Sequence, residues 1–311
     1  MPNYNTGNLI KRLRKQKGLT QEELAYPLID RATLSRIESG RAMPSKKTLE
    51  ALLEKLGFNP SNTADFFLDG EMTEVQKIHN ELEEYLVLRK LDYADPMIGK
   101  IDALVEQLAN NKRYMKNELN QQFVMVVRAM NAINKGAEEE DVRTMLHDAL
   151  KISIPEFDEE QFEEYHLSRQ DIQIINMLAV LYSIEGEDEK SSMMHYRMKR
   201  NLEKNCIDRV EMGRNYPTVV YNLAIQLFYL ERYEEAIEVC DVGSKVCRET
   251  RSFYFLPMLI ILKGNCLHQI GKSGEGERLL RQAYHTCEMF ENEAGMFLAK
   301  DYITRIMGLE F

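Results

Sequence analysis

The chain has 311 residues and a formal net charge of −10. Its length is too great for one small domain and leaves a large body beside an N-terminal module. No stretch approaches the roughly 18 consecutive apolar residues of a membrane span, and no signal peptide opens the chain. These features exclude a membrane-spanning protein and predict a cytoplasmic one with no membrane partner.

The charge is unevenly distributed along the chain. Residues 1–60 contain 11 Lys and Arg against 6 Asp and Glu, a net charge of +5, so residues 61–311 carry −15. A polyanion would be attracted to the first part and repelled by the second. The distribution favours a nucleic-acid-facing N-terminal end and a body that avoids nucleic acid.

Residues 20–40 predict two short helices joined by a tight turn. Thr20 and Glu23 form the S/T-x-x-E capping box that starts the first helix. Asp30 is a favourable N-cap for the second helix, and Gly40 supplies a left-handed stop. Apolar side chains from both helices are expected to hold the pair together: Leu24, Ala25, Leu28, Leu34 and Ile37.

This pattern resembles the lambdoid-repressor-like, or XRE-type, helix-turn-helix domain over about residues 7–66. A basic helix precedes the pair at residues 9–15 and is closed by Lys17-Gly18-Leu19. A further helix follows the pair at residues 45–56 and is ended by Gly57. One departure is Pro27, which stands where the family usually has glycine and cannot adopt a left-handed conformation. We assign residues 1–68 to this DNA-binding domain.

The resemblance implies that the N-terminal half of the second helix enters the major groove. Arginine there would bind guanine, and the methyl groups of Ala32 and Thr33 would contact thymine methyl groups. Gln21 matches the family's phosphate-clamping glutamine. The alternative for each charged residue is a solvated surface side chain. The predicted DNA-binding residues are Gln21, Arg31, Ala32, Thr33, Arg36, Arg41 and Lys46.

A linker helix is expected near residues 72–91, within a segment assigned to residues 69–92. Its Val75, Ile78, Leu82 and Tyr85 fall at a and d spacing, which suits pairing with a twin helix across a homodimer. Packing into the first hairpin of its own chain is the alternative. A homodimer on a palindromic double-stranded DNA operator is expected mainly because repressor-like domains read two half-sites.

Residues 93–311 follow a helical pattern interrupted by turns, so the predicted fold class is all-α. Long helices that alternate with such breaks predict a stacked array of hairpins. The predicted turns are Asp95-Pro96, Asn110-Asn111, Lys135-Gly136, Ile154-Pro155, Glu185-Gly186, Glu231-Arg232 and Ile270-Gly271.

Small residues recur in these hairpins in a tetratricopeptide-like pattern. Ala224 and Ala236 occupy the pattern's small positions, Gly264 and Gly276 correspond to them about 40 residues later, and Ala179 does so about 45 residues earlier. The two helices of a repeat must approach closely, which explains the small residues. The spacing exceeds the usual length of about 34 residues, so the predicted α-solenoid has degenerate repeats.

The two halves together resemble the Rgg, PlcR and PrgX regulators of Gram-positive bacteria and the phage arbitrium receptors. Those proteins bind short signalling peptides, and the peptide alters how a dimer holds DNA. The resemblance implies a quorum-sensing transcription regulator and not an enzyme. Two alternatives stay open: a solenoid that docks a protein partner instead of a peptide, and a phosphatase of the Rap type, which shares the solenoid.

The first helix of each hairpin is expected to line the concave face of the solenoid. Asparagine amides carry both a donor and an acceptor, so Asn176, Asn222 and Asn265 could clamp a peptide backbone; alternatively they cap turns or pair with neighbouring helices. The predicted peptide-binding residues are Gln173, Asn176, Tyr221, Asn222, Ile225, Phe228, Asn265 and His268.

The sequence predicts no catalytic, metal or cofactor site. The six histidines lack HxxxH and HExxH spacing, and Gly271-Lys272-Ser273 lacks the glycine of a phosphate-binding loop, because Cys266 stands in its place. Two acidic runs, at residues 138–141 and 158–160, are expected to open helices. The five cysteines are expected to be reduced core residues: Cys206, Cys240, Cys247, Cys266 and Cys287.

Overall fold

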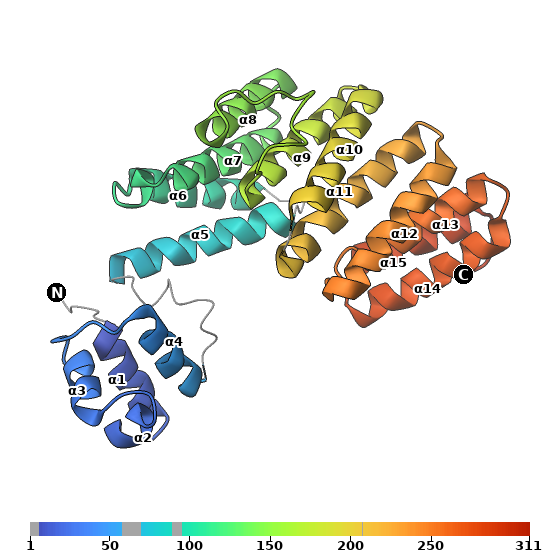
Figure 1. The fold of residues 1–311 in the computed structure, drawn as a ribbon. Coiled ribbons are helices and arrows are strands. Elements are labelled where there is room, and N and C mark those ends of the chain that lie inside the picture. The colour runs from blue at the N-terminus through green and yellow to red at the C-terminus, as the bar shows by residue number, and fades with distance from the viewer. Residues whose placement is uncertain (1–5, 58–69, 89–94, 207) are drawn as a thin grey trace. The chain divides into compact units, whose positions relative to one another are not determined.

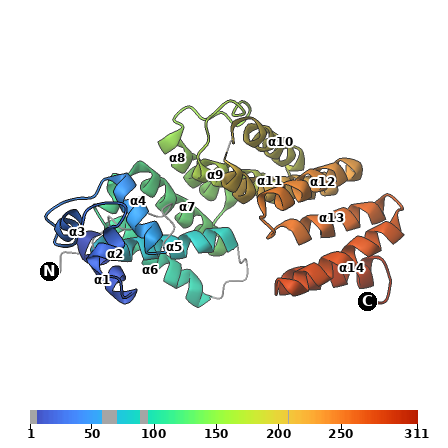
Figure 2. The same ribbon diagram turned by 60° about the horizontal axis from the view of Figure 1, so that its bottom comes forward.

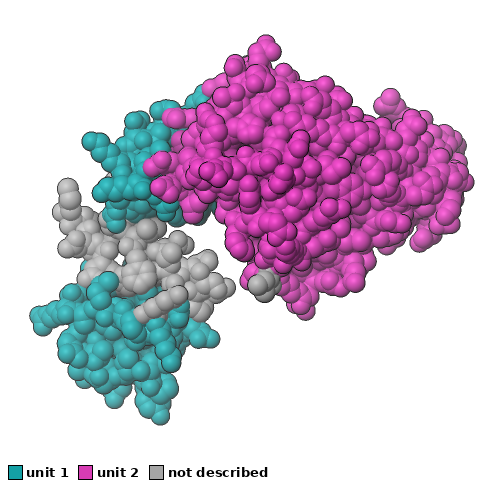
Figure 3. Space-filling view, turned by 45° about the horizontal axis from the view of Figure 1, so that its top comes forward, with its two compact units in different colours: residues 1–117 teal, residues 118–311 magenta. Residues whose placement is uncertain are grey.

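The computed structural model describes residues 6–57, 70–88, 95–206 and 208–311 (Figure 1). Within these ranges all regular elements are helices, which confirms the all-α prediction. The chain divides into two compact units, residues 1–117 and 118–311 (Figure 3). The predicted boundaries near residues 68 and 92 both fall outside the described residues, so the domain limits remain predictions.

The first four helices form the predicted repressor-like arrangement. Gly18, Gly40 and Gly57 adopt left-handed φ values of 69°, 72° and 81° directly after the helices that they were expected to end. Ser45 caps the fourth helix by accepting a hydrogen bond from the Thr48 amide. The helices are α1 (Thr6–Gln16), α2 (Gln21–Ala25), α3 (Arg31–Glu38) and α4 (Lys46–Lys55).

One apolar cluster holds these helices together, and it corrects one predicted member. Leu28 is 39% exposed, and Ile29 packs against the cluster in its place. The chain turns at a cis Tyr26-Pro27 peptide bond. Which of the two neighbouring side chains faces inward depends on how the surrounding helices pack. The buried members are Ile10, Leu24, Ala25, Leu34, Ile37, Leu49, Leu52, Leu53 and Leu56.

The predicted linker helix is α5 (Gly70–Leu88), which packs against α6 (Asp95–Asn110). A short 3-10 turn, η2 (Tyr114–Lys116), follows α6. Val75, Leu82 and Tyr85 are buried within the single chain. Their burial favours packing within the chain over pairing with a twin helix.

The second unit is a row of antiparallel helix hairpins, as Figures 1 and 2 show. Each helix packs against the next along the chain. Its elements are α7 (Glu118–Asn134), α8 (Glu139–Ser153), α9 (Arg169–Ile184), α10 (Asp188–Asn205), α11 (Arg209–Tyr229), α12 (Tyr233–Thr250), α13 (Leu256–Gln269), α14 (Ser273–Met289), α15 (Glu293–Asp301) and the π-helical turn η3 (Tyr302–Ile306).

The same turn joins the two helices of successive hairpins. Gly186, Glu231 and Gly271 all adopt left-handed φ values, of 81°, 58° and 82°. In each case the next amide donates a 2.8 Å hydrogen bond to a carbonyl five residues earlier: Glu187 to Tyr182, Arg232 to Leu227, and Lys272 to Leu267. This is the Schellman pattern of a helix C-terminus. Its recurrence at the predicted positions confirms the hairpin array.

Small residues allow the helices of a hairpin to approach closely. A Cβ atom added at Gly276 of α14 would lie 2.5 Å from the carbonyl oxygen of Gly264 on α13. Ala224 on α11 and Ala236 on α12 are fully buried. The backbones therefore contact one another where the sequence pattern places its small residues.

Two sequence interpretations of the second unit need correction. The acidic run at residues 138–141 opens α8 as expected, but the run at residues 158–160 lies in the connection between α8 and α9, so its assignment to a helix start is wrong. Cys206 is half-buried, whereas the other four cysteines are buried thiols. Among the described residues, no helix is both long and apolar enough to cross a membrane.

Candidate DNA-binding surface and repeat-domain inner layer

Side chains at both helix starts pre-form the predicted DNA-reading hairpin. The Glu23 amide donates a 3.1 Å hydrogen bond to Thr20 Oγ1, and the Thr20 amide donates one of 2.7 Å to Glu23 Oε2. These two bonds form the predicted capping box of α2. Lys55 of α4 donates hydrogen bonds to the carbonyl oxygens of Glu23 and Tyr26. The turn before α3 is thus tied to the domain core.

Asp30, Thr33 and Arg36 form a chain of hydrogen bonds along α3. The Thr33 amide and hydroxyl each donate to the Asp30 carboxylate at 2.7 Å, and Arg36 Nη2 donates to Thr33 Oγ1 at 3.0 Å. The Thr33 side-chain and backbone hydrogen bonds hold the pKa of Asp30 below its ordinary value. The carboxylate therefore stays charged at neutral pH.

The predicted DNA-binding residues lie on the surface of this unit. Arg31, Ala32, Arg36 and Arg41 are exposed, and Thr33 is half-buried. Arg31, Ala32 and Thr33 lie in the first turn of α3, and Arg36 lies in its last turn. Lys46 begins α4, but its side chain lies outside the described residues.

Gln21 is held in place by a buried ion pair that sequence reasoning missed. Glu38 accepts hydrogen bonds from Arg14 Nε at 2.6 Å and Arg14 Nη2 at 2.9 Å, and Gln21 Nε2 donates to Glu38 Oε2 at 2.9 Å. Burial acts to raise the pKa of Glu38, but the hydrogen bonds from Arg14 and Gln21 outweigh it and lower the pKa. The hydrogen bond to Glu38 therefore orients the side chain of Gln21, the predicted phosphate contact.

In the second unit the first helices of successive hairpins pack directly on one another: α7 on α9, α9 on α11, α11 on α13, and α13 on α15. In a stacked array, the layer whose helices lie closer together forms the inner, concave side. The predicted peptide-binding residues from residue 173 to residue 268 all lie on α9, α11 and α13 of this layer.

The structure brings Asn176 and Asn222 together but pairs them with each other. Asn222 Nδ2 donates a 2.8 Å hydrogen bond to Asn176 Oδ1, and His195 Nε2 lies 3.3 Å from the same oxygen. Asn176 is 3% exposed and Asn222 is 9% exposed. These two side chains therefore pair between neighbouring helices, which was the alternative to a peptide clamp.

Asn265 also points into the protein. It is buried on α13 and forms a side-chain hydrogen bond with Tyr302 of η3. Burial raises the pKa of Tyr302, while this hydrogen bond acts in the opposite direction. The three predicted asparagine positions therefore share one property: their amides serve contacts within the repeat domain.

The other predicted peptide-binding residues keep part of their surface exposed. Gln173, Tyr221, Ile225, Phe228 and His268 are half-buried. The Tyr221 ring lies 5.7 Å from the ring of Phe255, centroid to centroid. Burial raises the pKa of Tyr221 to about 12, so this tyrosine is neutral. The layer therefore offers apolar and aromatic surface beside a few polar groups.

A second polar cluster anchors the connection between α8 and α9. Glu159 accepts hydrogen bonds from the Tyr182 hydroxyl at 3.0 Å, and its carboxylate lies 3.0 Å from His147 Nε2 and 3.1 Å from Lys190 Nζ. Burial acts to raise the pKa of Glu159, but these partners outweigh it and lower the pKa to about 2. The sequence carried no signal for this cluster, because the partners of Glu159 lie on three separate helices, α8, α9 and α10.

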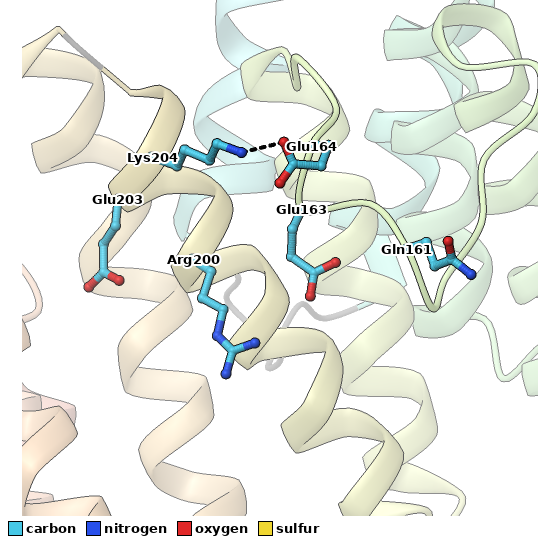
Figure 4. Close-up of a pocket in the computed structure, with 6 residues that line it drawn as sticks. All are labelled: Gln161, Glu163, Glu164, Arg200, Glu203 and Lys204. Carbon is cyan, nitrogen blue, oxygen red and sulfur yellow. Dashed lines mark hydrogen bonds and ion pairs between the residues drawn. The ribbon is translucent and has the colours of Figure 1, made fainter.

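The same connection forms a charged hollow with α10 (Figure 4). Asn201 Nδ2 donates hydrogen bonds to the carbonyl oxygens of Glu163 and Tyr165, and Lys204 pairs with Glu164. The hollow has a volume of about 690 Å³. Its charged lining differs from the mostly apolar lining of typical small-molecule sites. The lining residues are Gln161, Glu163, Glu164, Arg200, Glu203 and Lys204.

Two family profiles match the chain. A helix-turn-helix profile covers residues 10–61, and the profile of the RNPP family C-terminal domain covers residues 95–294, more than half of the chain. The chain belongs to the RNPP family. This family and its solved relatives are transcription regulators and not enzymes, which confirms that part of the sequence prediction. No curated protein sequence matches this RNPP family member.

Solved structures resemble this RNPP family member over nearly its full length. PlcR of Bacillus thuringiensis, in complex with the peptide PapR7 and DNA, has 21% sequence identity, a TM-score of 0.70, and coverage of 95% of this chain and 98% of that chain. The pheromone receptor Rgg2 of Streptococcus dysgalactiae has 17% identity, a TM-score of 0.59, and coverage of 97% and 99%.

ComR from S. thermophilus, in complex with DNA and its signalling peptide ComS, has 16% identity, a TM-score of 0.58, and coverage of 95% and 97%. At these identities the likeness establishes the shared fold. A helix-turn-helix domain followed by a helical-repeat domain is thus common to all three relatives and this RNPP family member.

Proposed function

We propose that the protein is a cytoplasmic transcription regulator that binds a double-stranded DNA operator through α3 and a short signalling peptide through its repeat domain. The observation that carries this proposal is the presence of both RNPP modules on one chain, aligned over 95% of its length with PlcR in complex with a peptide and DNA. The peptide changes DNA binding only if it binds two arrangements of the protein with different affinities.

For the DNA side, the proposed contacts are divided by chemistry. Arg31, Ala32, Thr33 and Arg36 on α3 read base edges, because these exposed or half-buried positions lie on the helix that enters the major groove in this fold. Gln21, Arg41 and Lys46 contact phosphates and set the register on the duplex. A homodimer would place two such surfaces on a palindromic operator.

For the peptide side, the proposed contact surface is the inner layer of α9, α11 and α13. Tyr221, Ile225 and Phe228 on α11 offer half-buried apolar surface, while Gln173 and His268 supply polar groups on the neighbouring helices. Ligand sites combine a mostly apolar lining with a few polar groups. Asn176, Asn222 and Asn265 would support this surface through their contacts with one another, with His195 and with Tyr302.

The test is to purify the full chain from its host and identify co-purifying short peptides by mass spectrometry of the denatured extract. The synthetic peptide is then added back to the purified protein in a DNA-binding titration. One dominant peptide that changes DNA affinity supports the proposal. A stoichiometric protein partner in place of a peptide would contradict it and would favour a docking role for the repeat domain.

A matched pair of variants locates the site. Phe228→Ala removes half-buried apolar surface from the proposed contact surface, whereas Val242→Ala removes an exposed apolar side chain from α12, in the other layer. We expect the first change to weaken peptide binding and the second to leave it unchanged. Equal peptide affinities in both variants would place the site elsewhere.

A further inference from the structure

We propose that Asp30 and Thr33 are positioning residues for Arg36. We further propose that the same hydrogen bonds hold the Thr33 hydroxyl and leave the Thr33 methyl group facing DNA. This inference rests on the proposed function, in which Arg36 reads a base edge. It is carried by the hydrogen bonds that run from the Asp30 carboxylate through the Thr33 hydroxyl to the Arg36 guanidinium.

The direction of these hydrogen bonds follows from the chemistry of the groups. A carboxylate only accepts and a guanidinium only donates. The Thr33 hydroxyl has one hydrogen, which it donates to Asp30 Oδ2 at 2.7 Å, and its oxygen accepts a hydrogen bond from Arg36 Nη2 at 3.0 Å. The hydroxyl hydrogen and one of the two acceptor lone pairs are therefore engaged within the protein. Thr33 can therefore not donate a hydrogen bond to a base without losing Asp30, whereas its methyl group stays available and suits the methyl group of thymine.

The consequence for Arg36 is pre-organisation. A flexible side chain loses conformational freedom when it binds DNA, and a contact that already restricts it reduces this loss. The guanidinium has five N–H donors, and the hydrogen bond to Thr33 uses one of those on Nη2. The other donors remain available for the two-bond contact that arginine makes with guanine. Asp30, which also caps α3, thus contributes to recognition through Thr33.

Three substitutions separate this role from a structural one. Thr33→Val keeps the shape and the methyl group but replaces the hydroxyl with a second methyl group. Thr33→Ser keeps the hydroxyl but removes the methyl group. Asp30→Asn keeps a favourable helix cap, but replaces one carboxylate oxygen with an NH2 group that cannot accept the Thr33 hydrogen.

The experiment uses full-length variants expressed from the native locus. Chromosomal DNA is recovered with each variant by immunoprecipitation at low and at high cell density, so that either state of the regulator is sampled. The base preferences of the wild type, of Arg36→Ala and of the three variants are then compared. The most enriched wild-type duplex serves as the probe in binding titrations, with thermal unfolding as a check on folding.

We expect Thr33→Val and Asp30→Asn to lose the base preference that Arg36→Ala loses, and to bind the probe roughly 2- to 10-fold more weakly, the value of one hydrogen bond. Thr33→Ser should retain that preference and lose a thymine preference at another position. If Thr33→Val retains the preference that depends on Arg36, the proposal is wrong. A wild type that recovers no common motif, or an Arg36→Ala variant with unchanged preferences, would instead contradict the proposed function.

Discussion

Asn222 Nδ2 donates a 2.8 Å hydrogen bond to Oδ1 of Asn176, and so joins the inner helices of two successive hairpins. Both side chains are buried. A buried amide without a partner costs stability, whereas a paired one is tolerated. The pair therefore ties the repeats together through groups that the sequence alone presents as candidate ligand contacts.

Asn222→Ala is expected to lower the free energy of unfolding by about 1–3 kcal/mol, because the Asn176 amide then loses a buried partner. Urea unfolding of the full chain measures the change. Gln269→Ala on α13 is the control, because its side chain is exposed and such changes stay within about 0.5 kcal/mol. Equal stability of the two variants would contradict the structural role, and unchanged peptide affinity in Asn222→Ala would remove this residue from the peptide site.

Gly276→Ala should destabilise the repeat domain by about 1–3 kcal/mol, because the added methyl group forces α13 and α14 apart. Its Cβ would lie 2.5 Å from a backbone oxygen, which cannot rotate away. Gly274→Ala, two residues earlier on the same helix, has open space at the added Cβ and should be neutral or more stable. Thermal unfolding compares them, and a loss of stability in both variants would count against the packing explanation.

Glu159 makes the stability of the repeat domain depend on pH. Its pKa is lowered from 4.5 to about 2 in the folded protein. Its contribution, up to roughly 3 kcal/mol by linkage, is therefore present above pH 4.5 and lost as the pH falls towards 2. Urea unfolding between pH 6 and pH 3 should show a steeper loss for the wild type than for Glu159→Gln. Parallel curves for the two proteins would exclude this origin.

Glu38→Gln should weaken the DNA-binding unit by about 3–5 kcal/mol, because it leaves the buried Arg14 guanidinium without a charged partner. Hydrogen exchange of the α1 and α3 amides reports this loss without interference from the repeat domain. Glu74→Gln is the control, since its ion pair with Lys77 is exposed and contributes at most about 1 kcal/mol. Similar exchange rates in the two variants would show that the buried pair is dispensable.

Arg36→Ala and Arg41→Ala should weaken DNA binding in different ways. Loss of a base contact at Arg36 should cost about 1–3 kcal/mol on the preferred duplex and little on unrelated DNA. Loss of a phosphate contact at Arg41 should weaken binding to all duplexes and reduce the salt dependence by about one counterion. Titrations at several salt concentrations distinguish the two patterns, and identical behaviour would refute the proposed division of contacts.

The sequence alone predicted the elements whose signals are local. The Thr20–Glu23 capping box, the Asp30 cap and the left-handed glycine at residue 40 depend on atoms a few residues apart, so the same residues act in the sequence and in the structure. The hairpin turns at residues 186, 231 and 271 were predictable for the same reason. The proposed DNA-reading residues on α3 follow from these local boundaries.

Only the tertiary structure decided the contacts between residues distant in sequence. Asn176 and Asn222 lie 46 residues apart, and nothing near either one shows that their amides face each other. The choice between Leu28 and Ile29 for the core, and the burial of Glu159 against Tyr182 and Lys190, likewise depend on how separate helices pack. Local hydrogen bonds determine where helices begin and end, whereas a side chain's partners are determined only when those helices meet.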